Sequence, residues 1–66
     1  MGIGRKIAKL RQEKNLTQKS LAERAGISES YLSRIEEENC PRPHMKALSR
    51  IADALRAEVR ELYDEN

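Results

Sequence analysis

Apolar residues recur every three or four positions along most of the chain, with charged or polar residues between them. This spacing is typical of short amphipathic helices. In the first segment Ile3, Ile7 and Leu10 have this spacing. They predict a helix from about Gly4 to Lys14. Asn15 follows, and asparagine tolerates the left-handed backbone conformation that commonly ends a helix.

A second helix is predicted to begin after Thr17, whose hydroxyl can accept a hydrogen bond from the free amides of the first turn. It ends at Gly26, which supplies the positive φ that a change of direction requires. Ser28 is the next expected cap, and a third helix follows it. Only Ile27 separates Gly26 from Ser28, so the two helices must cross steeply, as in a helix-turn-helix unit. The apolar residues assigned to these helices are Leu21, Ala22, Ala25, Tyr31, Leu32 and Ile35.

Two prolines, Pro41 and Pro43, predict a loop over residues 37–43, because proline is excluded from helix interiors. A fourth helix is expected at about residues 44–55 and a short fifth helix at about residues 58–64. The predicted fold is therefore all-α, a compact bundle of five short helices. The apolar positions assigned to the last two helices are Met45, Leu48, Ile51, Ala52, Leu55, Val59, Leu62 and Tyr63.

Composition supports this fold and a single domain over residues 1–66. The chain has no Phe or Trp and only one Val and one Thr, so a strand-based core is improbable. Its single cysteine, Cys40, excludes an intramolecular disulfide and fits a reducing compartment. No apolar run approaches the length of a signal-peptide core or a membrane span. We therefore expect a cytoplasmic protein with no membrane partner.

Charge is distributed unevenly along the chain although the net charge is only +2. Residues 1–34 hold eight Lys or Arg against three acidic residues, a net of +5, and residues 35–66 hold five against eight, a net of −3. Such an asymmetry would orient the molecule on a polyanion. Solvated helix surfaces also carry charges of this kind, so charge alone leaves both interpretations open.

Residues for catalysis or for cofactor binding are not assembled in this sequence. One Cys and one His cannot form a zinc set, and Cys40 has no neighbouring base that would activate it. The acidic run Glu36–Glu38 is more simply the solvated end of a helix, and no glycine-rich phosphate loop is present. We expect no enzyme activity, no cofactor, no metal and no small-molecule substrate.

The most informative segment is residues 18–37, QKSLAERAGISESYLSRIEE. This segment combines three features. It has a small residue where the two helices approach, a glycine at the turn and apolar residues after that glycine. With IAKLRQEKNLTQKSLAERAGIS and PHMKALSRIADAL, this segment resembles the Cro/CI-type helix-turn-helix family of repressors, the XRE family. SYLSRIEEENCPRP resembles the DNA-binding domain of SinR-type repressors, which carry a further multimerisation segment outside the part that is similar.

The resemblance implies a lambda-repressor-like fold and a sequence-specific, DNA-binding transcriptional regulator. It further implies a repressor that binds a short palindromic operator in double-stranded DNA as a dimer. Two positions depart from the family pattern. Many members have glycine where this chain has Arg56, and Ser or Thr where it has Glu58, so we expect the connection between the last two helices to be less standard.

Base recognition is assigned by the resemblance to the third helix, which would enter the major groove. Arg34 is the foremost candidate, because a guanidinium can bond bidentately to guanine O6 and N7. Glu29 could accept from a cytosine amino group, and Ser28 has the alternative role of capping the helix. The hydroxyl of Tyr31 would reach a phosphate. The positions matched to base contacts are Ser28, Glu29, Ser30, Ser33 and Arg34.

Backbone contacts are assigned by the resemblance to two other places. Thr17 and Gln18 begin the second helix, where free amides and the helix dipole favour an anion. The second place is the loop before the fourth helix, where Arg42, held between two prolines, is the foremost candidate. The loop positions that would touch the backbone of the same DNA strand are Asn39, Arg42 and His44.

The resemblance also assigns a structural role to one pair of residues. Arg11 and Glu36 match a family ion pair that links the first helix to the end of the third. Loss of one partner would leave a partly buried charge uncompensated.

Two questions stay open at this point. The apolar residues of the last helix are either plain core or part of a dimer interface, and we expect a homodimer through the last two helices. The alternative function is a protein-interaction module on the same fold, such as an antitoxin-like partner binder. Glu29 on the recognition helix and the modest net charge favour that alternative.

Overall fold

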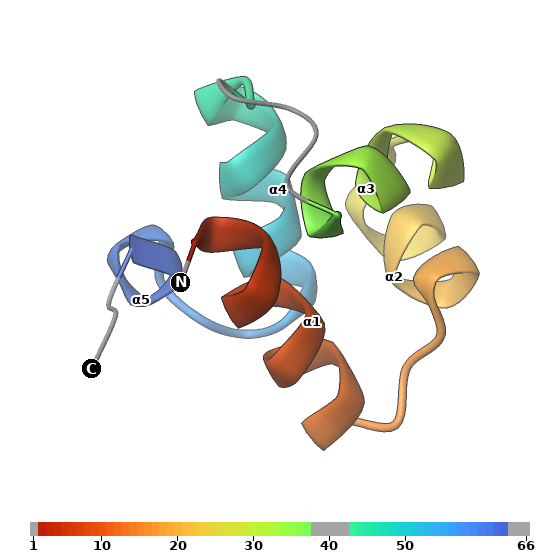
Figure 1. The fold of residues 1–66 in the computed structure, drawn as a ribbon, viewed down its shortest axis with the longest axis horizontal. Helices are drawn as coiled ribbons and strands as arrows, with labels where there is room; N and C mark the ends of the chain where they lie inside the picture. Colours follow the sequence, from red (N-terminus) through yellow and green to blue (C-terminus); the bar gives the residue numbers. More distant parts are fainter. Residues whose placement is uncertain (1, 38–42, 64–66) are drawn as a thin grey trace.

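The computed structural model describes residues 2–37 and 43–63. In this part of the chain there are five helices and no strand (Figure 1), which confirms the predicted all-α fold class. None of these helices has the length and apolar character needed to cross a lipid bilayer. The helices are α1 (Ile3–Glu13), α2 (Gln18–Ala25), α3 (Glu29–Glu36), α4 (Met45–Ala54) and α5 (Val59–Tyr63).

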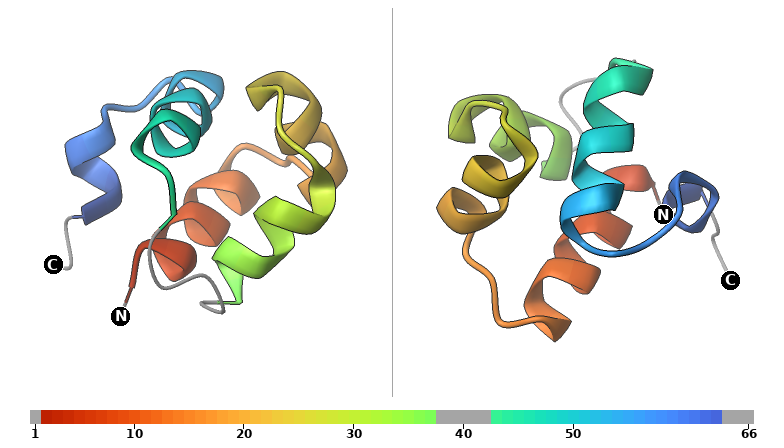
Figure 2. Two further views of the ribbon diagram at one scale, coloured as in Figure 1. Left: turned by 90° about the horizontal axis from the view of Figure 1, so that it is seen from above. Right: turned by 180° about the vertical axis from the view of Figure 1, so that it is seen from behind.

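The helices surround one apolar core to which all five contribute. Figures 1 and 2 show that α2 and α3 lie on one side of α1, and that α5 lies on its opposite side. The helix α4 passes between α5 and the α2–α3 pair. Leucine and isoleucine fill the centre, as the composition predicts. The largest fully buried side chains are Ile7, Leu21, Leu32, Ile35, Leu48, Ile51, Leu55 and Leu62.

Three helices end in the same backbone motif. After α1, α2 and α4 one residue has a positive φ, namely Asn15 (58°), Gly26 (72°) and Arg56 (58°). At each end the next N–H donates to the carbonyl five residues back, at 2.8–3.0 Å. This pairing satisfies carbonyls that the helix itself leaves free. The stops predicted at Asn15 and Gly26 are confirmed. The junction after α4 has Arg56 where many members of the family have glycine, yet its backbone geometry is the same.

Met45 is a correction to the predicted core. Its side chain is 58% exposed, whereas Ala47 two residues later is buried. Met45 is the first residue of α4, and helical side chains tilt toward the N-terminus of their helix, so it extends beyond the edge of the core. In α5 only Leu62 is fully buried, and Tyr63 is 47% exposed.

Gly4 has a role that no local pattern in the sequence indicates. It lies where α1 meets the end of α3, and a Cβ atom placed there would overlap the carbonyl oxygen of Ile35. The same atom would lie 2.9 Å from the carbonyl oxygen of Glu36. Only glycine allows the two backbones to approach this closely, so Gly4 sets the position of α3 against α1.

Candidate nucleic-acid interface

The start of α2 is capped by Thr17, as predicted. Its Oγ1 accepts a hydrogen bond from the Ser20 N–H at 3.0 Å and donates to the Ser20 Oγ at 3.1 Å. The backbone of Thr17 is extended, with φ −83° and ψ 165°, which is the usual conformation of an N-cap. The hydroxyl of Thr17 is therefore already engaged in holding the first turn of α2.

Ser28 caps α3. Its Oγ accepts from the Tyr31 N–H at 3.1 Å, so the capping role that the sequence left as an alternative is confirmed. A serine hydroxyl that accepts one hydrogen bond still has its own hydrogen to donate. Ser28 is exposed, and that hydrogen is free to reach a group outside the protein.

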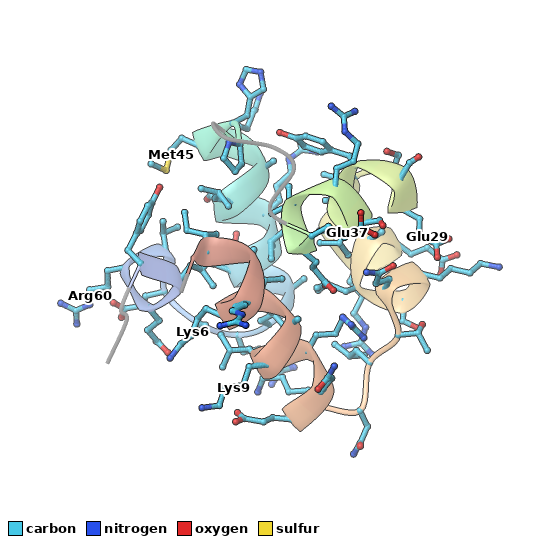
Figure 3. All side chains as sticks on the ribbon, viewed as in Figure 1. Lys6, Lys9, Glu29, Glu37, Met45 and Arg60 are labelled. Carbon is cyan, nitrogen blue, oxygen red and sulfur yellow. The ribbon has the colours of Figure 1, made fainter. Side chains whose placement is uncertain are left out.

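The outward face of α3 carries most of the residues matched to base contacts. Glu29, Ser30 and Arg34 are exposed, and the opposite face is buried. Figure 3 shows Glu29 at the outer end of α3, pointing away from the core, while Glu37 follows the other end of the helix. Arg34 belongs to the last turn of α3 and Glu29 to the first.

Ser33 differs from the other positions on this face. It is half-buried, and its hydroxyl donates to Oε2 of Glu37 at 3.3 Å, one turn further along. Ser33 is thus less available for an external contact than Ser30. The structure places four of the five predicted base-reading positions on α3 and the fifth, Ser28, at its N-cap, but it leaves them unequally accessible.

A three-residue polar network ties α1, α2 and α3 together. Arg11 donates through Nε to Oε2 of Glu36 at 2.9 Å and through Nη2 to Oε1 at 3.0 Å. This bidentate pair is the one that the resemblance implied. The side chains are only 14% and 5% exposed, respectively, so the pair is largely withdrawn from solvent. Charge-assisted bidentate geometry of this kind is strong and directional.

Gln18 joins the same network, which the sequence did not indicate. Its Nε2 donates to Oε1 of Glu36 at 3.0 Å, and Arg11 also donates through Nη1 to the carbonyl of Leu16 at 2.9 Å. The side-chain amide of Gln18 is therefore oriented by Glu36 at the end of α3. Residues at i and i+18 carry no local signal of contact, so only the packing of the helices reveals the bond.

The start of α4 is joined to α3 by Tyr31. Tyr31 is half-buried and lines the same groove as Ile27 of the turn, and its hydroxyl oxygen accepts from the His44 N–H at 3.1 Å. His44 is the N-cap residue of α4, and its side chain is exposed and makes no capping hydrogen bond. The two other predicted loop contacts, Asn39 and Arg42, lie outside the described residues.

An open groove of about 320 Å³ runs between the start of α4 and the start of α3. Its floor is apolar and its α4 side carries two cations, Lys46 and Arg50, which the sequence analysis did not select. Their separation of four residues puts them on one face of a helix, and that spacing was the available signal. The groove is lined by Ile27, Tyr31, His44, Lys46, Ala47 and Arg50.

The arrangement matches a known family over most of the chain. The family profile described as "Helix-turn-helix" matches residues 7–62. The chain belongs to the helix-turn-helix family. Within this family, α2 and α3 form the two helices of the motif, and Gly26 lies in the turn between them.

Two similar proteins come from Bacillus subtilis and from a Bacillus phage. The chain is 38% identical over 63 residues to the "HTH-type transcriptional regulator SinR" of Bacillus subtilis (strain 168), with 96% of this chain and 57% of that protein covered. It is also 38% identical over 65 residues to the "Immunity repressor protein" of Bacillus phage phi105, with 98% and 44% covered. The chain thus spans about half the length of the curated relatives it matches.

A solved structure of SinR in complex with DNA also has this fold. It superposes with a TM-score of 0.90 at 37% identity, covering 94% of this chain and 98% of that one. Identity at this level over nearly the whole chain supports a shared architecture for the helix-turn-helix unit and for the helices around it.

Proposed function

We propose that this domain is the sequence-specific DNA-binding part of a transcriptional regulator, and that the regulator is a repressor acting in the cytoplasm. The observation that carries the proposal is the outward face of α3. It exposes Glu29, Ser30 and Arg34, while a cap at its start and a nearly buried ion pair at its end hold the helix rigidly. Rigid presentation of polar side chains is what base recognition needs. Similarity to SinR and to a phage immunity repressor supports the assignment.

In this proposal α3 lies in the major groove. Arg34 bonds to guanine O6 and N7, and Glu29 accepts from a cytosine amino group. Ser30 and Ser33 add contacts to base edges, with the contribution of Ser33 reduced by its hydrogen bond to Glu37. Phosphates on either side fix the register of the helix without reading sequence.

Phosphate binding at the start of α2 uses two kinds of donor. The N–H of Ser20 is taken by the Thr17 cap, but those of Gln18 and Lys19 have no partner within the helix, and the helix dipole favours an anion there. Gln18 has a second hydrogen on Nε2 besides the one given to Glu36. The hydrogens of the Ser28 and Tyr31 hydroxyls are also available to donate, and Asn39, Arg42 and His44 complete the proposed contacts to the DNA backbone.

The proposed functional unit is a homodimer formed through α4 and α5. Met45 and Tyr63 are the exposed large hydrophobic residues among those described, and they belong to these two helices. A two-fold dimer places two copies of α3 in successive major grooves, about 34 Å apart. A palindromic operator is the DNA counterpart of that symmetry.

Selection of bound duplexes from a random DNA pool tests the function directly. We expect a palindromic consensus whose half-sites are spaced by about one helical turn, and binding that weakens steeply as salt increases. A protein-interaction module on the same fold would give no enrichment. Failure to retain any DNA at about 50 mM salt would contradict DNA binding, because electrostatic attraction is strongest at low salt.

Arg34→Ala tests the assignment of base reading. We expect a loss of about 1–3 kcal/mol on the selected operator, with relaxed discrimination at one base pair per half-site. Gln18→Ala is the comparison variant and should weaken binding to operator and random duplexes by similar factors. Equal losses for Arg34→Ala on both duplexes would remove Arg34 from the base-reading set.

A further inference from the structure

The groove between the starts of α3 and α4 combines apolar surface with positive charge. The half-buried Ile27 and the buried Ala47 form its floor, and Tyr31 of α3 also lines it. Lys46 and Arg50 line the α4 side, and none of the other described lining residues is acidic. A DNA phosphate would use the two cations alone and would leave the apolar floor without a partner. The complementary occupant carries both carboxylates and an apolar side chain.

Hydrogen-bond donors around the floor are available to such an occupant. Both cations are exposed, and among the described residues neither makes a hydrogen bond or an ion pair. The Tyr31 hydroxyl accepts from the His44 N–H at 3.1 Å, so its own hydrogen is left to donate. A Cβ atom built on Gly26 would lie 3.4 Å from Nη1 of Arg50, which places the guanidinium beside the turn that leads into α3. Carboxylates are strong acceptors for donors of these kinds.

The shape of the groove favours a protein segment over a small molecule. Small-molecule sites enclose most of the surface of their ligand, whereas this groove is open, and its volume of about 320 Å³ is close to the lower limit of such sites, about 300 Å³. A partner helix can place a few side chains in such a groove while the rest of the helix stays outside. Lys46 and Arg50 lie four residues apart, with Cβ atoms about 5–6 Å apart, and two carboxylates one turn apart on a partner helix have the same spacing.

We propose that this groove is the docking site for an acidic, amphipathic segment of a partner protein, and that the docked segment excludes DNA. Its carboxylates pair with Lys46 and Arg50, and an apolar side chain between them covers the floor. The exclusion of DNA rests on the proposed function. Tyr31 belongs to α3 and Ile27 directly precedes the N-cap of α3, so a segment in the groove adjoins the helix that would enter the major groove. The partner thus releases the regulator from its operator.

Selection from a library of short random peptides displayed on phage tests the chemistry of the occupant. The 66-residue chain is the immobilised target, and we expect a consensus with two acidic residues and a large apolar residue between them. Binding of the labelled consensus peptide is then measured by fluorescence anisotropy. Replacing the apolar residue of the peptide by alanine should weaken binding about tenfold, because that side chain covers the floor. Replacing each acid by its amide should weaken binding about two- to fivefold, as for other solvent-exposed ion pairs.

Three variants of the chain, each lacking one positive charge, locate the site. Lys46→Ala and Arg50→Ala should each weaken binding of the consensus peptide about two- to fivefold. Lys9→Ala is the matched control and should bind as the wild type does, because Lys9 is exposed on α1 and points away from α3 and the start of α4 (Figure 3). Circular dichroism establishes that each variant is folded.

Competition with DNA tests the regulatory consequence. The unlabelled consensus peptide is added to the chain bound to its labelled selected operator, and we expect the operator to be released as the peptide concentration rises. The peptide with alanine at the apolar position should need about tenfold more to release it, in proportion to its weaker binding.

Four results would overturn the inference while leaving the proposed function intact. The first is no enrichment of acidic peptides by the wild-type chain. The second is equal binding of the consensus peptide by Lys46→Ala, Arg50→Ala and Lys9→Ala. The third is equal binding of the consensus peptide and its alanine counterpart, which would reduce the groove to a surface for polyanions such as DNA. The fourth is a ternary complex of chain, peptide and operator. Absence of DNA binding by the wild-type chain would instead reject the proposed function, and peptide binding would still decide whether the groove is a docking site.

Discussion

The α2–α3 pair and the α4–α5 pair have the same construction. In each pair, a short turn with one residue of positive φ joins two helices. At the first turn this residue is Gly26, with φ 72°, and at the second it is Arg56, with φ 58°. The N–H after each donates to a carbonyl five residues back, at 3.0 Å for Ile27 and 2.8 Å for Ala57. The two turns therefore share a backbone geometry although only one of them has the residue that favours it.

Side chains around the two turns differ as well. Both helices of the first pair have a hydroxyl cap, from Thr17 and Ser28, and Glu36 ties the pair to α1. In the second pair α4 has no side-chain cap, and α5 is only five residues long. Leu62 packs α5 into the core. The same backbone turn is thus encoded by local residues in the first pair and imposed by the surrounding packing in the second.

Glu36→Ala should produce the largest effect, because it removes the polar tie of the first pair. It leaves Arg11, whose side chain is 14% exposed, without its carboxylate. We expect a loss of about 3–5 kcal/mol of unfolding free energy, as for other ion pairs largely withdrawn from water, measured by urea denaturation. The double variant Arg11→Ala/Glu36→Ala is the control, and it should lose less than the sum of the two single changes. Strict additivity would mean that the two side chains act independently.

Leu62→Ala tests whether packing alone holds the second pair. Leu62 is almost fully buried, and its truncation leaves a cavity, so we expect a loss of about 2–3 kcal/mol. Tyr63→Ala, at the exposed neighbouring position, should change stability by no more than about 0.5 kcal/mol. Chemical denaturation of both variants makes the comparison. Similar small losses would show that α5 contributes little to the core.

Gly26→Ala tests the locally encoded turn. The nearest atom to the added Cβ is Nη1 of Arg50 at 3.4 Å, so space is adequate and the cost comes from the backbone conformation. An L residue at positive φ costs about 1–2 kcal/mol, and thermal unfolding should detect this loss. Gly26→Asn should lose less, because asparagine tolerates this conformation. An equal loss for both would point to a steric cause instead.

Arg56→Gly is the reverse experiment at the imposed turn and should give the smallest effect, with the opposite sign. Glycine relieves the strain of positive φ but has more freedom to lose on folding, so the net gain is about 0.5–1 kcal/mol. Arg56→Ala removes the same side chain without relieving the backbone and should give no gain in thermal unfolding. A gain for both variants would assign the effect to the arginine side chain.

Much of the fold was predictable because its signals are local. The caps at Thr17 and Ser28 and the positive-φ residues Asn15 and Gly26 are confirmed at the predicted positions. Each reports an interaction between residues at most five positions apart, and such interactions depend little on the rest of the molecule. The outward face of α3 follows from helical periodicity for the same reason.

The candidate site was predicted less completely. The resemblance correctly assigned the pair of Arg11 with Glu36, but not the bond that holds Gln18 to the same carboxylate. Lys46 and Arg50 were also missed, because only the approach of α4 to the α2–α3 turn turns two ordinary surface cations into the wall of a groove. Contacts between residues far apart in sequence leave no periodic signal along the chain.

Helix boundaries, apolar faces and the position of the helix-turn-helix unit were all predictable from the residues alone. These properties follow from hydrogen-bonding and steric preferences of neighbouring residues. Three other properties depend on how the helices pack: Gly4 must be small, Met45 lies outside the core and Arg56 adopts a conformation suited to glycine. In each case the deciding partner is a distant element or the edge of the core, and its position exists only after the helices have packed.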